Sequence, residues 1–272
     1  MKYHNKCRIC GSEDLVDIVN LGNQALSSVF PKEEESDPTK SPLELIKCQS
    51  CKFVQLRHSA DLEEMYGTTY GYYSGLSKSM VKHLNFKAEE LLKLVDPPLN
   101  ANILDIGCND GTLLNHYLGP ANRSDLNAYG VDPSSEKFKN FINPKVNVFY
   151  EFFGSEFINK FHDKKFHIIT SIAMFYDLDD PKDFVKTIAS CLSIDGVWSL
   201  ELSYLPLFLK QLSYDQLCHE HVGYYNLEDL KNLFLSFDLS IFEVNLNDMN
   251  GGSIYLKVCH KEALSKYNNP KN

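Results

Sequence analysis

The stretch Ile103-Leu-Asp-Ile-Gly-Cys-Asn-Asp-Gly111 decides the fold that this chain of 272 residues can adopt. Its apolar residues predict a buried strand, its glycines predict a turn, and the chain looks helical from Thr112 onward. A second apolar segment, 127–131, is followed by Asp132, which lies 21 residues after Gly111. A strand, a glycine turn, a helix and a second strand that ends in an acid are the parts with which a doubly wound α/β sheet binds an adenosine.

The spacing of the glycines and the charges beside them indicate which kind of ligand this turn could bind. Gly107-x-x-x-Gly111 does not match G-x-G-x-x-G, and no Lys-Ser or Lys-Thr pair follows to make a phosphate-binding loop. Asp105 and Asp110 flank the turn, where their negative charges would repel a pyrophosphate and attract a cation. The sulfonium and amino groups of S-adenosylmethionine (SAM) fit these electrostatics. A core strand with a glycine turn and no ligand is the alternative.

The segment from Asp105 to Gly111 resembles the D-x-G-x-x-x-G motif of the class I SAM-dependent methyltransferases. Asp132 lies at the distance expected for the acid that accepts hydrogen bonds from the ribose hydroxyls. The resemblance implies that SAM is the cofactor. The residues predicted to bind it are Tyr70, Asp105, Gly107, Cys108, Asn109, Asp110, Gly111, Asp132, Pro133, Ala173 and Met174.

Composition limits the class of protein further. A chain of this length can hold one full α/β domain and a smaller one. The formal net charge is -9 without a large basic patch, which argues against a nucleic-acid partner. The apolar runs are far shorter than a membrane span, and the first residues contain no apolar signal segment. We therefore expect a cytoplasmic protein without a membrane span.

Four of the eight cysteines form two C-x-x-C pairs, Cys7 with Cys10 and Cys48 with Cys51. Each pair can direct two thiolates at one point, and two such turns complete a tetrahedral Zn²⁺ site. The interval of 37 residues between the pairs is long for a zinc ribbon, and a redox-active pair is the alternative. The other cysteines are scattered singly, which is typical of reduced thiols. Four cysteine ligands leave no open position, so we expect a structural zinc.

The patterns along the chain predict three units. They are a zinc-binding domain over 1–60, a helical linker with a tyrosine-rich loop over 61–100, and a methyltransferase domain over 101–272. Strands and helices alternate in the third unit, which predicts a doubly wound Rossmann-like sheet that is mainly parallel and covered on both faces. The expected strands after the first two are 146–150, 166–172, 196–202, 239–246 and 253–258, the expected helices are 77–95, 181–192 and 226–237, and 31–42 is expected to be a loop.

A group of ionisable residues follows the strand over 196–202. It contains His219, Glu220 and His221, and an extended backbone would place the two histidines on one face and the glutamate on the other. This segment would lie at the carboxyl edge of the sheet, where open α/β sheets bind their ligands. A histidine at this edge can act as a general base because its pKa lies near the working pH. A hydrogen-bonded structural loop is the alternative.

Two further segments would border the same edge. The loop with Tyr66, Tyr70, Tyr72 and Tyr73 could cover a sulfonium by cation–π attraction or bind a sugar hydroxyl, and a packing cluster is the alternative. In the loop 173–180, Tyr176 is the best-placed polar side chain. Two acids of that loop, Asp177 and Asp179, are expected to be solvated turn residues.

Together these segments resemble the sugar C-methyltransferase family, which methylates nucleotide-linked deoxysugars. The resemblance covers nearly the whole chain. It rests on the cysteine lobe with Leu21-Gly-Asn-Gln-Ala-Leu-Ser-Ser, Tyr70-x-Tyr72-Tyr73-Ser74 before a helix with His83, the SAM motif, Tyr214-Asp-x-x-x-x-Glu220-His221, and Gly251-Gly252-Ser253. It implies that Tyr72, Glu220 and His221 lie at the acceptor, and that His221 removes a proton from the carbon beside a keto group. With Tyr176 these residues form the predicted catalytic set.

Three departures from the family pattern leave other functions open. Family members continue into a C-terminal domain that helps form the sugar-nucleotide site, so a partner chain could supply that domain here. Cys218 replaces a tyrosine of the family, and we align a family histidine with Tyr176. Methylation of a sugar oxygen or of a small phosphorylated group is therefore the first alternative, and a SAM-binding subunit that needs a partner is the second. The expected product is a methylated sugar for a surface polysaccharide or a glycosylated metabolite.

Overall fold

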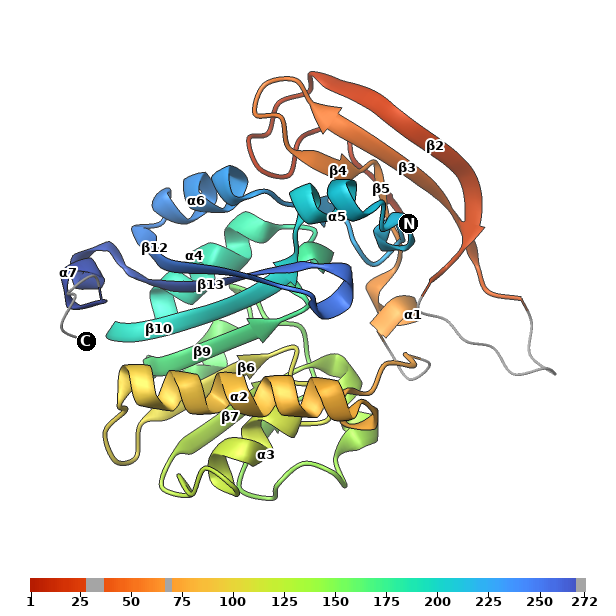
Figure 1. Ribbon diagram of the computed structural model, residues 1–272. Helices are drawn as coiled ribbons and strands as arrows, with labels where there is room; N and C mark the ends of the chain where they lie inside the picture. The colour runs from red at the N-terminus through yellow and green to blue at the C-terminus, as the bar shows by residue number, and fades with distance from the viewer. Residues whose placement is uncertain (28–36, 67–69, 268–272) are drawn as a thin grey trace.

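The computed structural model describes residues 1–27, 37–66 and 70–267, and a seven-stranded sheet forms its centre (Figure 1). The strand order is β12-β13-β10-β9-β6-β7-β8. Strands β10, β9, β6, β7 and β8 are parallel, whereas β13 is antiparallel to both of its neighbours. The prediction of a mainly parallel, Rossmann-like sheet is therefore confirmed. The strands are β6 (Asn102–Ile106), β7 (Asn127–Val131), β8 (Asn147–Phe149), β9 (Phe166–Ile172), β10 (Leu192–Ser203), β12 (Leu239–Asn247) and β13 (Ser253–His260).

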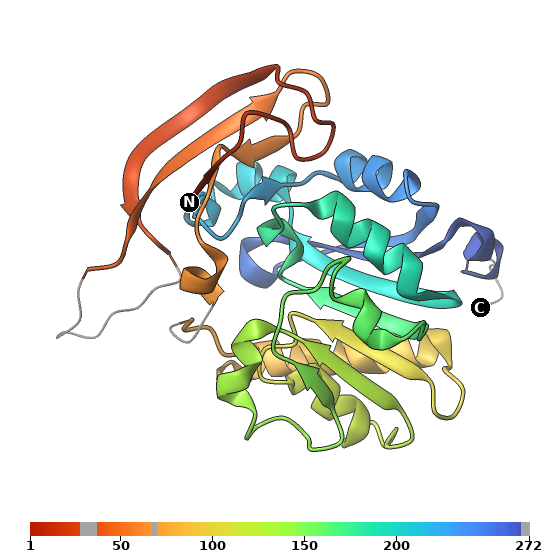
Figure 2. The ribbon, with the colours of Figure 1, turned by 180° about the vertical axis from the view of Figure 1, so that it is seen from behind.

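Helices cover both faces of this sheet (Figures 1 and 2). One face carries α2 (Lys78–Val95) and α3 (Thr112–Leu118), and the other carries α4 (Pro181–Cys191) and α6 (Leu227–Leu235). Each face has its own buried apolar cluster. The remaining α-helices are α1 (Leu62–Tyr66), α5 (Leu205–Gln211) and α7 (Leu264–Tyr267). Within the described ranges, no helix is long and apolar enough to cross a bilayer.

The sequence of α2 explains both its start and its packing. The Ser77 side chain accepts a hydrogen bond from the Met80 backbone N–H and so caps the first turn. Apolar residues then recur every three or four positions and are buried against the sheet. His83 bonds Glu201 of β10 at 2.7 Å on the same face, which fixes the helix to the end of that strand. The helix predicted as a linker is thus an integral layer of the core.

The N-terminal lobe is a second sheet, with the order β11-β4-β3-β2. Its strands β2 (Leu15–Ala25), β3 (Lys40–Cys48) and β4 (Val54–Leu56) come from the lobe itself, whereas β11 (Gly223–Tyr224) comes from the C-terminal half of the chain. A two-stranded sheet pairs β1 (Lys2–Tyr3) with β5 (His58–Ser59). Figure 1 shows that the β2–β3 hairpin extends away from the core. The lobe and the core therefore share hydrogen-bonded backbone.

The sequence did not indicate β2, and one boundary of the loop predicted over 31–42 is wrong. β3 begins at Lys40, so positions 40–42 are strand, while 31–36 lie outside the described residues. β2 is exposed along most of its length, and no alternation of buried and exposed side chains marks it as a strand. Its pairing with β3 alone defines it.

Candidate active site

A cavity of about 890 Å³ opens at the carboxyl ends of the parallel strands. It is lined by the turn after β6, the start of the segment after β7, the loop after β9, the tyrosine loop and four residues of the segment after α5, which are Asp215, Gln216, Glu220 and His221. These segments are far apart in the sequence, and the sheet brings them together because parallel strands end at one edge. The cavity has the size of an ordinary small-molecule site.

The turn after β6 and the acid after β7 are joined directly. Asp132 Oδ2 accepts a hydrogen bond from the Asn109 backbone N–H at 2.9 Å, and its Oδ1 accepts one from Ser134 N–H at 2.7 Å. Each carboxylate oxygen has a second lone pair. Both oxygens can therefore still accept hydrogen bonds from the two hydroxyls of a ribose, so the Asp132 carboxylate fits the adenosine part of SAM.

The backbone of the turn leaves room for a ligand. Gly107 has φ 75°, and a Cβ at this position would lie 3.1 Å from Met174 Cγ, so the backbone approaches the cavity as only glycine allows. Asp105 is buried and accepts a hydrogen bond from Thr170 Oγ1 at 2.5 Å, and burial raises its pKa to about 7. Asn109, Pro133 and the other predicted cofactor residues line the cavity, with two exceptions.

The two exceptions are Asp110 and Gly111. Asp110 stabilises the turn through hydrogen bonds outside the cavity lining. Asp110 Oδ1 accepts hydrogen bonds from the N–H and hydroxyl of Thr112 and so starts α3. Its Oδ2 accepts one from Gly75 N–H at 2.8 Å, which fastens the tyrosine loop. The Asn109 side chain also fastens the tyrosine loop, because its Oδ1 accepts a hydrogen bond from Ser74 N–H at 3.0 Å. The SAM turn thus positions the tyrosine loop as well.

Some side chains of the tyrosine loop line the cavity, and one packs outside it. Tyr70 and Tyr72 line the cavity together with Tyr66 at the end of α1. Tyr73 stacks on Phe138, with ring centroids 5.2 Å apart, and lies outside the lining. The packing alternative therefore describes Tyr73, and the binding interpretation is kept for the other three. Positions 67–69 lie outside the described residues.

Removal of the Asp132 carboxylate should weaken SAM binding. Hydrogen bonds to a charged group contribute about 1.5–3 kcal/mol, so we expect Asp132→Ala to raise the dissociation constant by about tenfold to a hundredfold. Calorimetric titration with SAM measures this directly. Glu262 is exposed and does not line the cavity, so Glu262→Ala is the matched control. Unchanged affinity in the Asp132 variant would remove the assignment of this acid to the cofactor.

The segment with the two histidines does not follow the alternation predicted for an extended backbone. It bends at 218–220, and both Glu220 and His221 line the cavity. His219 points elsewhere: it is buried, and its Nε2 lies 3.0 Å from the Ser41 carbonyl oxygen in β3. The structural alternative therefore holds for His219. The prediction that the histidines share one face is wrong, because hydrogen bonding to the N-terminal lobe sets the path of this backbone.

His221 has a neutral imidazole in contact with an aromatic ring. Its ring centroid lies 4.0 Å from that of Tyr176, and burial lowers the pKa of His221 to about 4. The imidazole is therefore unprotonated near pH 7 and can accept a proton, but it is a weaker base than the histidine with a pKa near the working pH that the sequence predicted. The Tyr176 hydroxyl donates to the Ala173 carbonyl at 3.0 Å, so this side chain orients the histidine ring rather than offering a free hydroxyl.

The expectation that Asp179 is a solvated turn residue is wrong. It forms ion pairs with Lys2 at 3.2 Å, His4 at 3.4 Å and Arg8 at 3.4 Å. Burial alone would raise the pKa of Asp179, but hydrogen bonds from His4 and Ser59 and the charge of Arg8 outweigh it and hold the pKa well below its ordinary value. The Arg8 side chain is itself only 2% exposed. The loop after β9 is thus fastened to the N-terminal lobe.

Loss of the Asp179 charge should destabilise the protein. Asp179→Asn leaves the buried Arg8 without its carboxylate, and we expect a loss on the order of 3 kcal/mol in the free energy of unfolding at pH 7. Because the folded pKa is depressed, this contribution is present above the ordinary carboxyl pKa and is lost as the pH falls below it. Urea denaturation at pH 7 and pH 3 should show the difference from wild type shrinking in acid. Asp163→Asn, at an exposed acid, is the control. Equal stabilities at pH 7 would contradict the contact.

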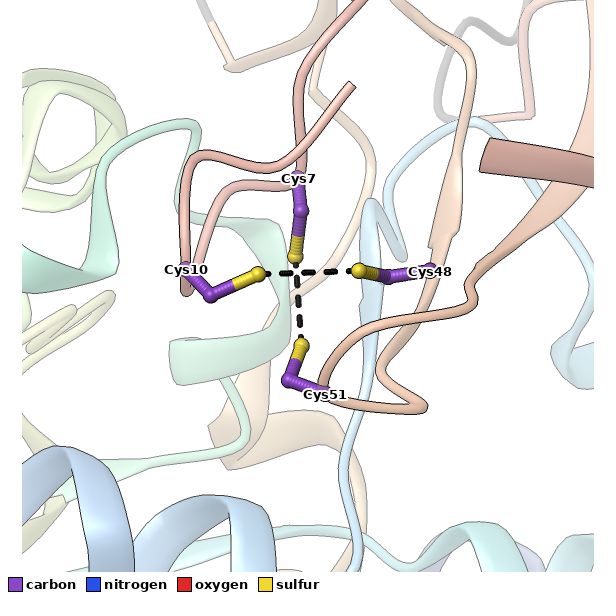
Figure 3. A group of neighbouring side chains, drawn as sticks. All are labelled: Cys7, Cys10, Cys48 and Cys51. Carbon is purple, nitrogen blue, oxygen red and sulfur yellow. Dashed lines mark hydrogen bonds between the residues drawn. The ribbon is translucent and has the colours of Figure 1, made fainter. Parts of the chain in front are cut away.

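The four cysteines of the lobe form one cluster (Figure 3). Their sulfurs lie within 4.8 Å of one another, and two pairs, Cys7 with Cys51 and Cys10 with Cys48, are 3.5 Å apart. Zn–S bonds of about 2.3 Å in a tetrahedron place sulfurs about 3.8 Å apart, so small movements would accommodate the ion. The donor set and its geometry fit a structural Zn²⁺.

Sequence reasoning undervalued one cavity residue. Asp177 lines the cavity, although the sequence suggested a solvated turn, and Tyr66 lies beside it. The signal that could have found Asp177 is its place soon after β9, at the carboxyl edge where ligands bind. Its burial depends on α1 and residues 218–221, which no local pattern reveals.

Two family models match the chain. A model described as a zinc binding domain matches residues 7–66, and one described as a methyltransferase domain matches residues 80–244, which is more than half of the chain. The C-methyltransferase NovU from Streptomyces niveus is 26% identical over 257 residues, covering 92% of this chain and 59% of the relative. A tRNA U34 carboxymethyltransferase from Campylobacter curvus is 32% identical over 122 residues, covering 42% of this chain and 39% of the relative. The chain thus spans about three fifths and two fifths of these relatives.

Solved structures share the fold. The plantazolicin methyltransferase BpumL, in complex with a desmethylPZN analogue and SAH, is 14% identical with a TM-score of 0.54, covering 69% of this chain and 88% of that chain. A complex of the Haloferax volcanii Trm112 methyltransferase activator with a methyltransferase is 13% identical with a TM-score of 0.53. The match covers 68% of this chain and 94% of that chain. At these identities the similarity describes the architecture of the core.

Proposed function

The chain belongs to the methyltransferase domain family, and from this membership we propose that it transfers a methyl group from SAM to a carbon of a sugar, in particular a nucleotide-linked keto deoxysugar. The transfer of a methyl group from SAM, predicted from the sequence, agrees with the family and with the residues around Asp132. The acceptor and the atom that is methylated are the proposed part. The product would serve a surface polysaccharide or a glycosylated metabolite.

One observation carries the proposal: the neutral imidazole of His221 lies in the same cavity as the SAM turn. Methylation at carbon requires a group that can take a proton, and an unprotonated histidine can do so. The similarity to a relative that is named a C-methyltransferase supports the same chemistry. Tyrosine and carboxyl side chains elsewhere in the lining offer hydrogen-bond partners for hydroxyl and keto groups.

The charge of the lining indicates which part of the acceptor enters. Among the described residues, carboxyl groups line the cavity and no lysine or arginine does. A diphosphate would be repelled there, whereas a sugar ring would not. We therefore place the sugar in the cavity and the nucleotide outside it, where a partner chain could contribute to binding.

Each of these residues would have its own role in the reaction. SAM, when bound, supplies an electrophilic methyl group. Asp132 orients the cofactor through its ribose, and His221 takes the proton from the carbon beside the keto group while Tyr176 fixes its ring. Positioning of donor and acceptor would provide most of the acceleration, and the base would add about 10²–10⁴-fold. Tyr72 and Glu220 would contact the acceptor.

Transfer from SAM with a carbon-13 methyl group tests this proposal. The protein is incubated with labelled SAM and nucleotide sugars that include 4-keto sugars, and the product is examined by NMR. A methyl group bound to carbon is the expected result. A methyl group bound to oxygen would contradict carbon methylation and favour an O-methyltransferase. Binding of SAM without transfer, also after a partner chain is added, would contradict a sugar acceptor of this kind.

A further inference from the structure

Two polar side chains from distant segments meet in the acceptor part of the cavity. Tyr66 is the last residue of α1, and Asp177 ends the short 3-10 helix Phe175–Asp177 after β9. Both line the cavity together with Glu220 and His221. Neither residue belongs to the set that the sequence predicted to be catalytic.

Both groups have unused hydrogen-bonding capacity. The Tyr66 hydroxyl and Asp177 Oδ1 are shielded from solvent and make no hydrogen bond of regular geometry among the described residues, although the two side chains lie close enough to interact with each other. A buried polar group without a partner costs about 1–3 kcal/mol. Such groups are rare in native proteins, and at the wall of a cavity a bound ligand is the partner that would satisfy them.

We propose that Asp177 and Tyr66 are catalytic residues that donate hydrogen bonds to the acceptor oxygen on which negative charge develops, and this inference rests on the proposed carbon methylation. The two groups would act as an oxyanion hole, and His221 would act on the neighbouring carbon. Glu220 is the fourth side chain of this group and lies beside Asp177.

The electrostatics of the cluster favour the protonated form of both groups, which is the form that can donate a hydrogen bond. Burial raises the pKa of Asp177 well above its ordinary value, and the neighbouring Glu220 raises it further. Burial and the charge of the neighbouring Glu220 likewise raise the pKa of Tyr66. A carboxylic acid that stays protonated near pH 7 can donate a hydrogen bond, as a neutral phenol can. An ionised Asp177 would instead repel a developing oxyanion.

The proposed step balances as follows. An imidazole nitrogen of His221 takes the proton from the carbon beside the keto group, and the C–H electron pair forms a carbon–carbon double bond. The carbonyl pair moves to oxygen, where Asp177 and Tyr66 stabilise the charge. When the carbonyl re-forms, the carbon bonds to the methyl group, the sulfur–methyl bond breaks and its electron pair stays on sulfur. No other reactant is needed.

Exchange of the carbon-bound proton with heavy water tests the inference apart from methyl transfer. The probe is a nucleoside-diphosphate-linked 4-keto-6-deoxyhexose, with S-adenosylhomocysteine in place of SAM. Loss of one oxyanion donor typically slows a reaction by about 10²–10³-fold, so Asp177→Ala should slow exchange by that factor. Asp177→Asn should retain most of the rate because its amide still donates. Tyr66→Phe should slow exchange, while all variants keep the wild-type affinity for SAM.

The outcomes separate the two proposals. No exchange in the wild type would refute carbon methylation, and with it the oxyanion hole. Exchange in the wild type that persists in Asp177→Ala would overturn the inference alone. Infrared difference spectra of wild type minus Asp177→Asn at pH 7 provide a test that needs no acceptor. They should show the carbonyl stretch of a protonated carboxyl, and a carboxylate band in its place would also overturn the inference.

Discussion

Replacement of His221 by alanine should abolish methyl transfer while SAM still binds. Among the described residues that line the cavity His221 is the only histidine, its depressed pKa of about 4 leaves it neutral near pH 7, and we propose that it faces the acceptor. Loss of a general base lowers the turnover rate by about 10²–10⁴-fold. Turnover with labelled SAM and calorimetric titration with SAM measure the two effects separately.

The same residue sets an expectation for pH. Because protonation blocks the base, its contribution should persist as the pH falls from 7 and be lost near the pKa of about 4. The exposed His162 provides the control variant His162→Ala, which should behave as wild type. Turnover that survives in His221→Ala would place the base elsewhere, and Glu220 would be examined next, since the Tyr176 hydroxyl is already bonded to Ala173.

Loss of zinc should remove turnover without removing the SAM site. The N-terminal lobe contacts both segments that we propose to face the acceptor: β4 pairs with β11 soon after His221, and Arg8 binds Asp179 in the loop after β9. The contacts of Asp132 lie within the core instead. We therefore expect the double variant Cys48→Ser, Cys51→Ser to lose turnover and to keep its affinity for SAM.

Metal analysis checks the premise of this prediction. Wild type should contain about one zinc per chain, and the double variant should contain none. Cys191→Ser, at a buried cysteine outside the cluster, should retain the metal. A metal-free protein that is folded and active would refute the four-cysteine site. An equal loss of SAM affinity would show instead that the lobe also supports the cofactor.

Local sequence was sufficient for the elements that form the core. The apolar run ending at Ile106, the turn, α3 and the strand before Asp132 all occur where the pattern places them. Periodicity also located α2, because burial on one face and a capping serine leave a signal within a few residues, and a continuous apolar run located β9. The C-x-x-C spacing likewise brought four sulfurs to one point.

Tertiary structure decided the rest. His219, Glu220 and His221 could be named from the sequence, but their directions depend on the hydrogen bond of the His219 side chain to β3 and on the backbone pairing of β11 with β4, both more than a hundred positions away. Asp179 is indistinguishable from a solvated turn residue until Arg8 approaches it. The sequence by itself determined the SAM turn, the zinc ligands and the parallel core, since their signals are local spacings. Only the docking of the lobe decided which polar side chains face the cavity, because burial and charge at one residue are set there by residues remote in the chain.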